Sequence, residues 1–297
     1  MMHRKSAAQI LALGALVALP VLASAQAAAT DAAAAAPADA AATPPAPNLT
    51  GNLEITTNYK FRGQDQDMIG HNGYAKSSYF KPAVQGGLDY AFGDSGFYVG
   101  NWNSSVNWLN GNSVEMDFYG GYKFKLSMFD MDVGAYQYYY PGNTAGNTTE
   151  LYVSGTYTNE QIGAFNLKYS GTVSDDYFNY AGRRAGSGLS GRGNGYLNLG
   201  YTKEIVPKVT LKANVGYTFF TSDIKSLGVK DYCDYLVGVS YDFGNGLSLM
   251  GSVQGGTNQD AFNAVTSPGF VTPIGILGGG TYSPNATRFI VTLTKTL

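Results

Sequence analysis

The sequence is poor in charge for its length. Asp, Glu, Lys and Arg make up 13% of its 297 residues, whereas soluble domains average about 25%. A surface with so few charges must face something other than water. The formal net charge of −2 also argues against a nucleic-acid partner, because phosphate binding needs a basic patch.

Cysteine and long apolar runs are equally scarce. Cys233 is the only cysteine, which excludes an internal disulfide and a cysteine-rich metal site. No apolar run is long enough for a membrane-spanning helix. No cofactor or metal motif is present, so no cofactor is expected. Glycine and tyrosine, by contrast, are abundant, with 39 and 23 residues, and this composition favours a membrane β-barrel.

The first residues have the pattern of a targeting signal. A basic patch at residues 3–5 precedes an apolar run from Ile10 to Leu22, and the small residues Ala23-Ser24-Ala25 follow. This layout predicts a cleaved signal peptide over residues 1–25 and export from the cytoplasm. Residues 26–48 are rich in alanine and proline and are expected to be disordered, because alanine buries too little apolar area to offset the entropy of ordering. Residues 49–297 form one β domain.

Apolar and polar residues alternate over many segments, which is typical of strands with one face in lipid and the other in water. In residues 114–125 four charges lie on one face and none on the other. Phe118, Tyr122 and Phe124 belong to the apolar face. A slip of one residue would place these charges in hydrocarbon, so the register is strongly specified.

Two further segments give explicit assignments of faces. In residues 52–62 the lipid face is expected to hold Leu53, Ile55, Thr57, Tyr59 and Phe61. In residues 98–108 it is expected to hold Tyr98, Trp102, Val106 and Trp108, with Asn101, Asn103 and Asn107 opposite. An aromatic girdle at the membrane interface is expected from Tyr59, Tyr90, Tyr122, Tyr217 and Tyr241.

Twelve such segments can be counted: 52–62, 81–92, 98–108, 114–125, 129–140, 149–158, 162–173, 195–203, 208–220, 232–243, 247–255 and 287–297. Long connections alternate with tight ones, and the long loops that begin at Gly63, Ser174 and Gly256 are candidates to fold inward. The expected fold is all-β, a transmembrane antiparallel barrel of about twelve strands connected as an up-and-down meander.

Several stretches resemble the TorF family of proteobacterial porins, a family of poorly defined role. They are NYKFRG at 58–63, QGGLDY at 85–90, SGFYVGNW at 95–102, EMDFYGGY at 115–122 and RFIVTLTK at 288–295. The resemblance covers residues 49–297. It implies an outer-membrane barrel with a pore, and it brings neither catalytic residues nor a known solute.

Polar residues of the wet faces are candidate pore-lining groups. They carry charges of both signs: Glu54, Lys60, Arg62, Lys81, Asp89, Glu115, Asp117, Lys123, Lys125, Glu150, Lys168, Lys212, Asp234, Asp242 and Arg288. One interpretation is a channel for small hydrophilic solutes in the outer membrane of a Gram-negative bacterium. The other is a plugged lumen, in which these groups pair to fill space, in a barrel with a structural or surface-binding role.

Catalysis is not expected. A hydrolase built on histidine would have to use His71 in the first long loop, near Asp65 and Asp67, and a lone loop histidine is usually solvated. The expected partners are outer-membrane lipid, lipopolysaccharide near Arg183, Arg184 and Arg192, the barrel-assembly machinery during biogenesis, and small hydrophilic solutes.

Overall fold

The structure is a computed structural model that describes residues 48–69, 80–108, 112–262, 264–265, 270–272, 275–277 and 281–297. The expected signal peptide, nearly all of the segment expected to be disordered, and His71 lie outside these residues.

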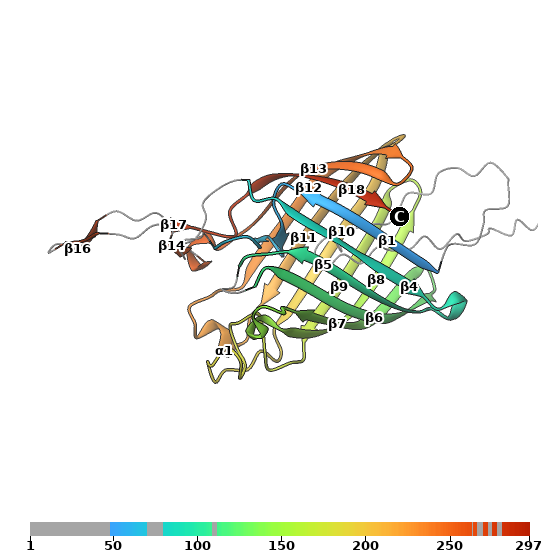
Figure 1. The fold of residues 1–297 in the computed structure, drawn as a ribbon. Coiled ribbons are helices and arrows are strands. Elements are labelled where there is room, and N and C mark those ends of the chain that lie inside the picture. The colour runs from blue at the N-terminus through green and yellow to red at the C-terminus, as the bar shows by residue number, and fades with distance from the viewer. Residues whose placement is uncertain are drawn as a thin grey trace, which may run out of the picture.

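Twelve strands close into an antiparallel barrel (Figure 1). Each strand pairs with its neighbours along the chain, and β1 closes the sheet by pairing with β18. The barrel strands are β1 (Leu49–Thr56), β4 (Ala83–Ala91), β5 (Phe97–Ser105), β6 (Val114–Leu126), β7 (Phe129–Tyr139), β8 (Thr148–Asn159), β9 (Gly163–Thr172), β10 (Gly195–Val206), β11 (Val209–Phe219), β12 (Tyr232–Gly244), β13 (Leu247–Gly256) and β18 (Arg288–Thr296). The predicted count and meander are therefore confirmed.

Short elements occupy the connections. The strand pairs are β2 (Lys60–Phe61) with β3 (Gln64–Asp65), β14 (Ala264–Val265) with β17 (Thr281–Tyr282), and β15 (Phe270–Thr272) with β16 (Gly275–Leu277). The helical turns are η1 (Gly93–Ser95), η2 (Thr144–Gly146), η3 (Gln259–Phe262) and α1 (Ser222–Lys225). In the described part of the chain, no helix has the length and apolarity needed to cross a membrane.

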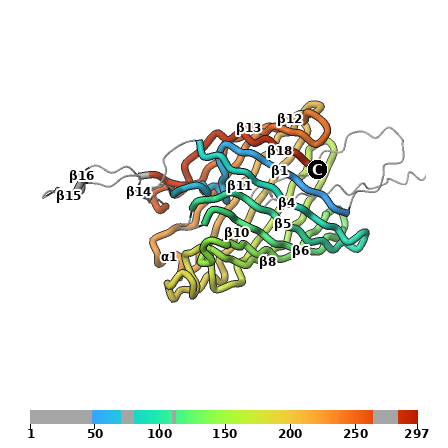
Figure 2. Tube along the Cα trace, viewed as in Figure 1, coloured from blue at the N-terminus to red at the C-terminus, as the bar shows by residue number. Residues whose placement is uncertain are grey.

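The two ends of the barrel differ. Tight connections lie at one end, here called the turn end, and long ones at the other, the loop end (Figure 2). At the turn end Asn245 and Gly246 have φ values of 54° and 73°, as a type I′ hairpin turn requires at both central positions. The first and last strands also meet there, where the Leu297 amide donates to Gly51 O over 2.8 Å.

The outer face carries a belt of large apolar side chains. At mid-strand they include Leu88, Phe118, Leu151, Leu167, Leu199, Val215, Val239 and Val253, each 43–53% exposed. Soluble monomers do not expose a continuous apolar surface of this extent. The belt therefore faces hydrocarbon, and the molecule is a transmembrane β-barrel.

The assignment of faces in β5 is wrong. Tyr98, Trp102 and Val106 point inward and are 7%, 2% and 5% exposed, while Asn101 and Asn103 lie on the outer face with Phe97 and Val99.

The outward amides of β5 are satisfied locally. Asn103 Nδ2 donates to Asn101 Oδ1 over 2.6 Å and to Gly86 O over 3.3 Å, and Asn101 Nδ2 donates to Asp117 O over 3.0 Å. Hydrophobicity misassigned the faces because the lumen itself is lined with aromatic rings.

Tyr59 is a second correction. β1 ends at Thr56, so the alternation that begins at Leu53 and Ile55 does not extend to Tyr59. Its side chain is 3% exposed and lies inside the barrel. The other girdle candidates, Tyr90, Tyr122, Tyr217 and Tyr241, are outward and 37–44% exposed.

A charge on the belt should be far more costly than the same charge in the lumen. Val239→Arg, near the middle of β12, is expected to lower the free energy of unfolding by about 2–4 kcal/mol. The matched control is Asn214→Arg on the adjacent strand β11, whose half-buried side chain faces inward and should cost less. Urea titration in lipid vesicles measures both, and equal losses would contradict the orientation.

Candidate functional site: the barrel lumen

A hairpin from the first long connection crosses the lumen near the loop end. It comprises residues 60–65, with β2 and β3 as its arms, and we call it the lumen hairpin. At its tip Arg62 and Gly63 have φ values of 47° and 76°. A Cβ added to Gly63 would lie 2.7 Å from Asp234 Cβ on β12, so only glycine fits this approach. The expectation that this loop folds inward is confirmed.

The base of the hairpin is held by a buried ion cluster, here called the Asp65 cluster. Lys60 Nζ lies 2.8 Å from Asp65 Oδ1, and Lys81 Nζ and Arg288 Nε lie 3.4 and 3.7 Å from Oδ2. These four side chains are 0–4% exposed. Lys60 completes its donor set with Gly63 O and Pro284 O. Burial lowers the pKa of Lys60 to about 8, although the Asp65 carboxylate opposes that fall.

The tip of the hairpin is held from another side of the barrel. Arg62 donates through Nη1 and Nη2 to both carboxylate oxygens of Glu150 on β8, over 3.0 and 2.6 Å. The guanidinium also lies 4.3 Å from the ring centroid of Tyr196. Bidentate arginine–carboxylate pairs fix geometry as well as charge. The hairpin is thus anchored to β8 at its tip and beside β18 at its base.

Acidic side chains line the inner face of β6. Glu115 accepts hydrogen bonds from the hydroxyls of Tyr59 and Tyr140. Asp117, two residues further on, is 0% exposed, and neither of its oxygens has a hydrogen-bond partner in the described part of the chain. The cations of the Asp65 cluster come instead from the hairpin, from the segment before β4 and from the first residue of β18.

Two walls of the lumen differ in bulk. Strands β5 to β8 carry a tyrosine wall, in which Tyr119 stacks on Tyr136 at 4.7 Å between centroids; its members are Tyr98, Tyr119, Tyr136, Tyr138 and Tyr152. The strands opposite present a small polar wall: Asn198, Thr202, Ser240, Ser252 and Thr292. Inward glycines make room for the rings, since a Cβ on Gly134 would lie 2.5 Å from the Tyr152 hydroxyl.

The structure places the predicted lining residues at three levels. The hairpin level brings together Lys60, Arg62, Lys81, Glu115, Asp117, Glu150, Asp234 and Arg288, all buried. Nearer the turn end, the inward groups are half-buried: Glu54, Asp89, Lys123, Lys168 and Lys212. Two candidates lie on the turn-end rim and not in the lumen: Lys125, paired with Asp130 at 49% and 55% exposure, and Asp242, which accepts from the Gly244 amide.

Sequence reasoning missed the central role of Asp65, because two of its three cations, Lys81 and Arg288, come from other segments of the chain. It also missed the tyrosine wall. The available signal was the run of inward glycines beside tyrosines, in strands where glycine otherwise weakens pairing.

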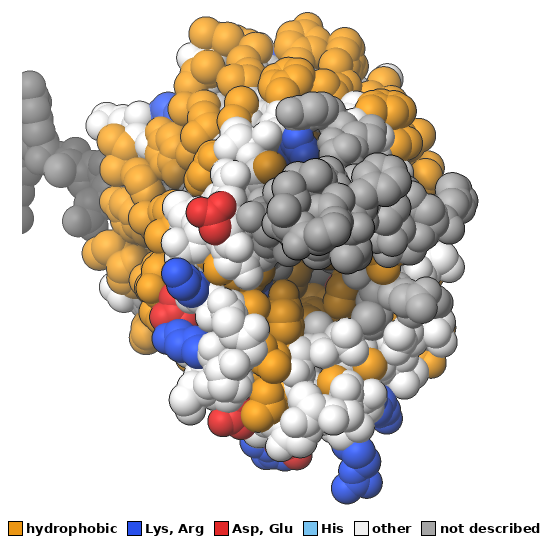
Figure 3. All heavy atoms as spheres, turned by 90° about the vertical axis from the view of Figure 1, so that its left-hand side faces the viewer, with side chains coloured by type: hydrophobic (Ala, Val, Ile, Leu, Met, Phe, Trp, Pro, Cys, Tyr) orange, Lys and Arg blue, Asp and Glu red, His pale blue; other side chains and the backbone are white. Residues whose placement is uncertain are grey.

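A cavity of about 260 Å³ lies on the loop-end side of the hairpin, and we call it the cup. Its floor includes Phe61 and Arg62, and loops supply the aromatic wall: Trp108, Tyr177, Phe178, Tyr180, Phe220, Tyr232 and Phe262. Burial raises the pKa of Tyr180 to about 12. Seen from the loop end, charges of both signs are scattered over the rim (Figure 3).

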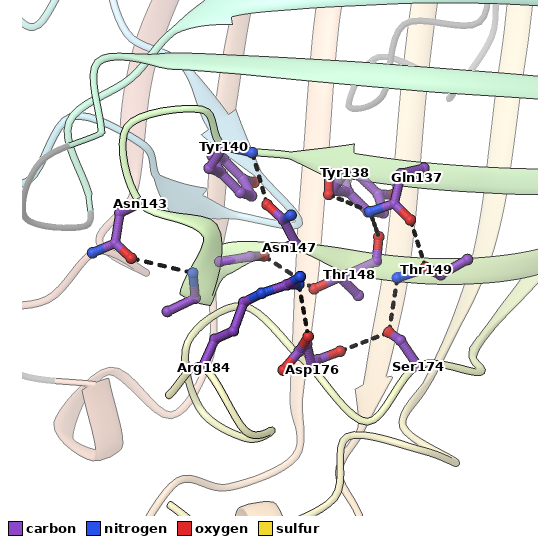
Figure 4. Close-up of polar contacts among 12 residues, drawn as sticks. Gln137, Tyr138, Tyr140, Asn143, Asn147, Thr148, Thr149, Ser174, Asp176 and Arg184 are labelled. Atoms are coloured by element: carbon purple, nitrogen blue, oxygen red, sulfur yellow. Dashed lines mark hydrogen bonds and ion pairs between the residues drawn. The ribbon is translucent and has the colours of Figure 1, made fainter. Parts of the chain in front are cut away.

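One wall of the cup is tied to the barrel. Figure 4 shows Ser174 and Asp176 beside the loop-end termini of β7 and β8. The Thr149 amide donates to Ser174 Oγ over 2.9 Å, and Arg184 pairs with Asp176 at 3.0 Å. The Phe178 amide donates to Thr148 Oγ1 over 2.9 Å, which fixes the backbone of a cup residue.

Residues 39–272 match the model of a family described as bacterial protein of unknown function (Gcw_chp). The chain belongs to this family. No curated protein matches the chain. The TorF resemblance predicted an outer-membrane barrel. The barrel is present, but the family whose model matches the chain is Gcw_chp and not TorF.

Solved structures of porins are similar to the chain at low identity. The KdgM porin is 12% identical, covers 83% of this chain and 98% of its own, and has a TM-score of 0.48. The NanC porin is 11% identical, with 84% and 97% covered and a TM-score of 0.48. Acinetobacter baumannii OccAB4 is 13% identical, with 84% and 62% covered and a TM-score of 0.38. The barrel assignment itself depends on the strand pairing described above.

Breaking the hairpin's tip anchor should be costly. Glu150→Ala leaves the Arg62 guanidinium buried without its partner and is expected to lower the free energy of unfolding by about 3–5 kcal/mol. The control is Asp130→Ala, which breaks the exposed pair with Lys125 and should cost at most about 1 kcal/mol. Urea titration measures both. A loss at Glu150 no larger than at Asp130 would refute the anchor.

Proposed function

We propose that this protein is an outer-membrane channel of the porin type, which passes small hydrophilic solutes between the tyrosine wall and the small polar wall. The lumen hairpin forms its constriction. The apolar belt supports insertion in a bilayer, and the alternating lengths of the connections match outer-membrane barrels, in which the long loops face outward.

One observation carries the proposal: charged groups inside the closed barrel keep contact with water. Glu54, Asp89, Lys123, Lys168 and Lys212 point inward yet are only half-buried. A barrel packed solid would bury or pair such groups completely, because an isolated buried charge is very costly. The turn-end half of the lumen is therefore a polar, water-accessible space, and the hairpin is what separates it from the loop end.

A second candidate function is a non-conducting barrel with a structural or surface-binding role. The observation in its favour is the packing at the hairpin level, where the ion-paired side chains of the hairpin and its partners are 0–8% exposed. The two candidate functions differ in whether the hairpin moves far enough to let a solute pass through the lumen.

Releasing the hairpin should widen the channel. Arg62→Ala with Glu150→Ala removes both partners of the tip anchor, so no unpaired charge is left buried. In planar bilayers the unaltered protein is expected to give discrete ohmic steps. The steps of the double variant should be severalfold larger, because the hairpin tip is no longer held to β8.

Lys125→Ala with Asp130→Ala is the control for this experiment, since it removes an exposed ion pair on the turn-end rim. Silence from unaltered protein that retains the circular dichroism of a barrel would support the non-conducting candidate. Conductance that is unchanged in the Arg62→Ala, Glu150→Ala variant would remove the hairpin from the solute path.

Asp89 should influence ion preference. Its carboxylate points into the lumen from β4 and is only half-buried, so it is a water-accessible anion that should favour cations. Asp89→Asn should therefore shift the reversal potential in a KCl gradient toward anion preference. The turn-rim variant Asp242→Asn is the control. An unshifted reversal potential would place Asp89 outside the ion path.

A further inference from the structure

The cup is walled by aromatic rings to an extent that a passage for hydrophilic solutes does not require. Its rings come from separate segments of the chain. Tyr232 and Phe262 meet edge to face at 5.2 Å, Phe220 lies 6.4 Å from Phe262, and Phe61 and Phe178 close the floor at 5.5 Å. Such convergence produces a preformed, mostly apolar pocket, the usual form of a small-molecule site.

We propose that the cup is a binding site for an uncharged, planar aromatic compound. The volume of about 260 Å³ is just below the roughly 300–1,000 Å³ of sites for drug-sized ligands, so the site suits a molecule of one or two rings. The site does not depend on whether the barrel conducts.

The charges around the cup exclude an ionised ligand. Arg62 and Asp65 are the only charged side chains in its described lining. Arg62 is already engaged at both nitrogens by Glu150, and Asp65 by Lys60. A bound ion would have to break one of these pairs or remain uncompensated, and either is costly. A neutral ligand meets neither penalty.

Trp108 adds an aromatic face to the cup and no polar contact. Its ring lines the cavity and packs edge to face on Tyr140 at 5.1 Å, while its indole Nε1 is buried away from solvent. The surrounding rings therefore favour a flat aromatic partner in offset or edge-on contact.

Acetophenone is a suitable probe, because it is planar, aromatic and uncharged. Equilibrium dialysis against the detergent-solubilised full chain, compared with detergent alone, should show saturable binding. Cyclohexyl methyl ketone lacks the aromatic ring, and benzoate carries a charge. Both should bind more weakly than acetophenone. Tighter or equal binding of benzoate would overturn the proposal, as would uptake no greater than that of the detergent.

One variant locates the site. Ala261, half-buried in the wall of the cup, can be replaced by phenylalanine to fill the cavity, and Ala261→Phe should abolish saturable binding. Far-UV circular dichroism should show that the variant folds. Unchanged binding in Ala261→Phe would place the ligand elsewhere and refute the assignment.

Discussion

Hydrocarbon offers no partner to a backbone amide or carbonyl, and this constraint governs the whole molecule. A sheet in a bilayer must therefore satisfy every backbone group within itself, which requires closure without an edge. Here closure comes from the pairing of β1 with β18, from Asn52 with Thr296 to Thr56 with Thr292. Once the sheet is closed, each strand has one face toward lipid and one toward an enclosed space, and every side chain falls on one or the other.

The enclosed space has to accommodate charge in a setting where unpaired charge is costly. The hairpin level does so by coupling distant segments: Asp65 meets Lys81 and Arg288, and Arg62 meets Glu150. These contacts hold a loop inside the barrel and offset the conformational entropy that is lost when the loop is ordered. The same contacts separate the water-accessible turn-end half from the aromatic cup, so one short hairpin divides the lumen into regions of different chemistry.

The barrel itself could be predicted from the alternation of residues, and the candidate site only in part. In β6, the charges lie on one face and Phe118, Tyr122 and Phe124 on the other. Only one orientation of the strand is therefore possible, with the charged face toward the lumen and the apolar face toward lipid. In β5, both faces contain groups that can be satisfied in either place: asparagines bond to strand carbonyls on the outside, and Trp102 packs against Tyr59 inside at 5.5 Å. Polarity alone cannot choose between such faces.

The sequence by itself determined the strand count, the meander, the sorting of loop lengths and the identity of most of the inward charges, because these depend on local periodicity and on turn chemistry. Only the tertiary structure decided which charges pair, how far the hairpin enters the lumen and where the rings of the cup converge. Those features depend on contacts between residues such as Arg62 and Glu150, which are 88 positions apart, and barrel curvature brings them together without leaving a local trace in the sequence.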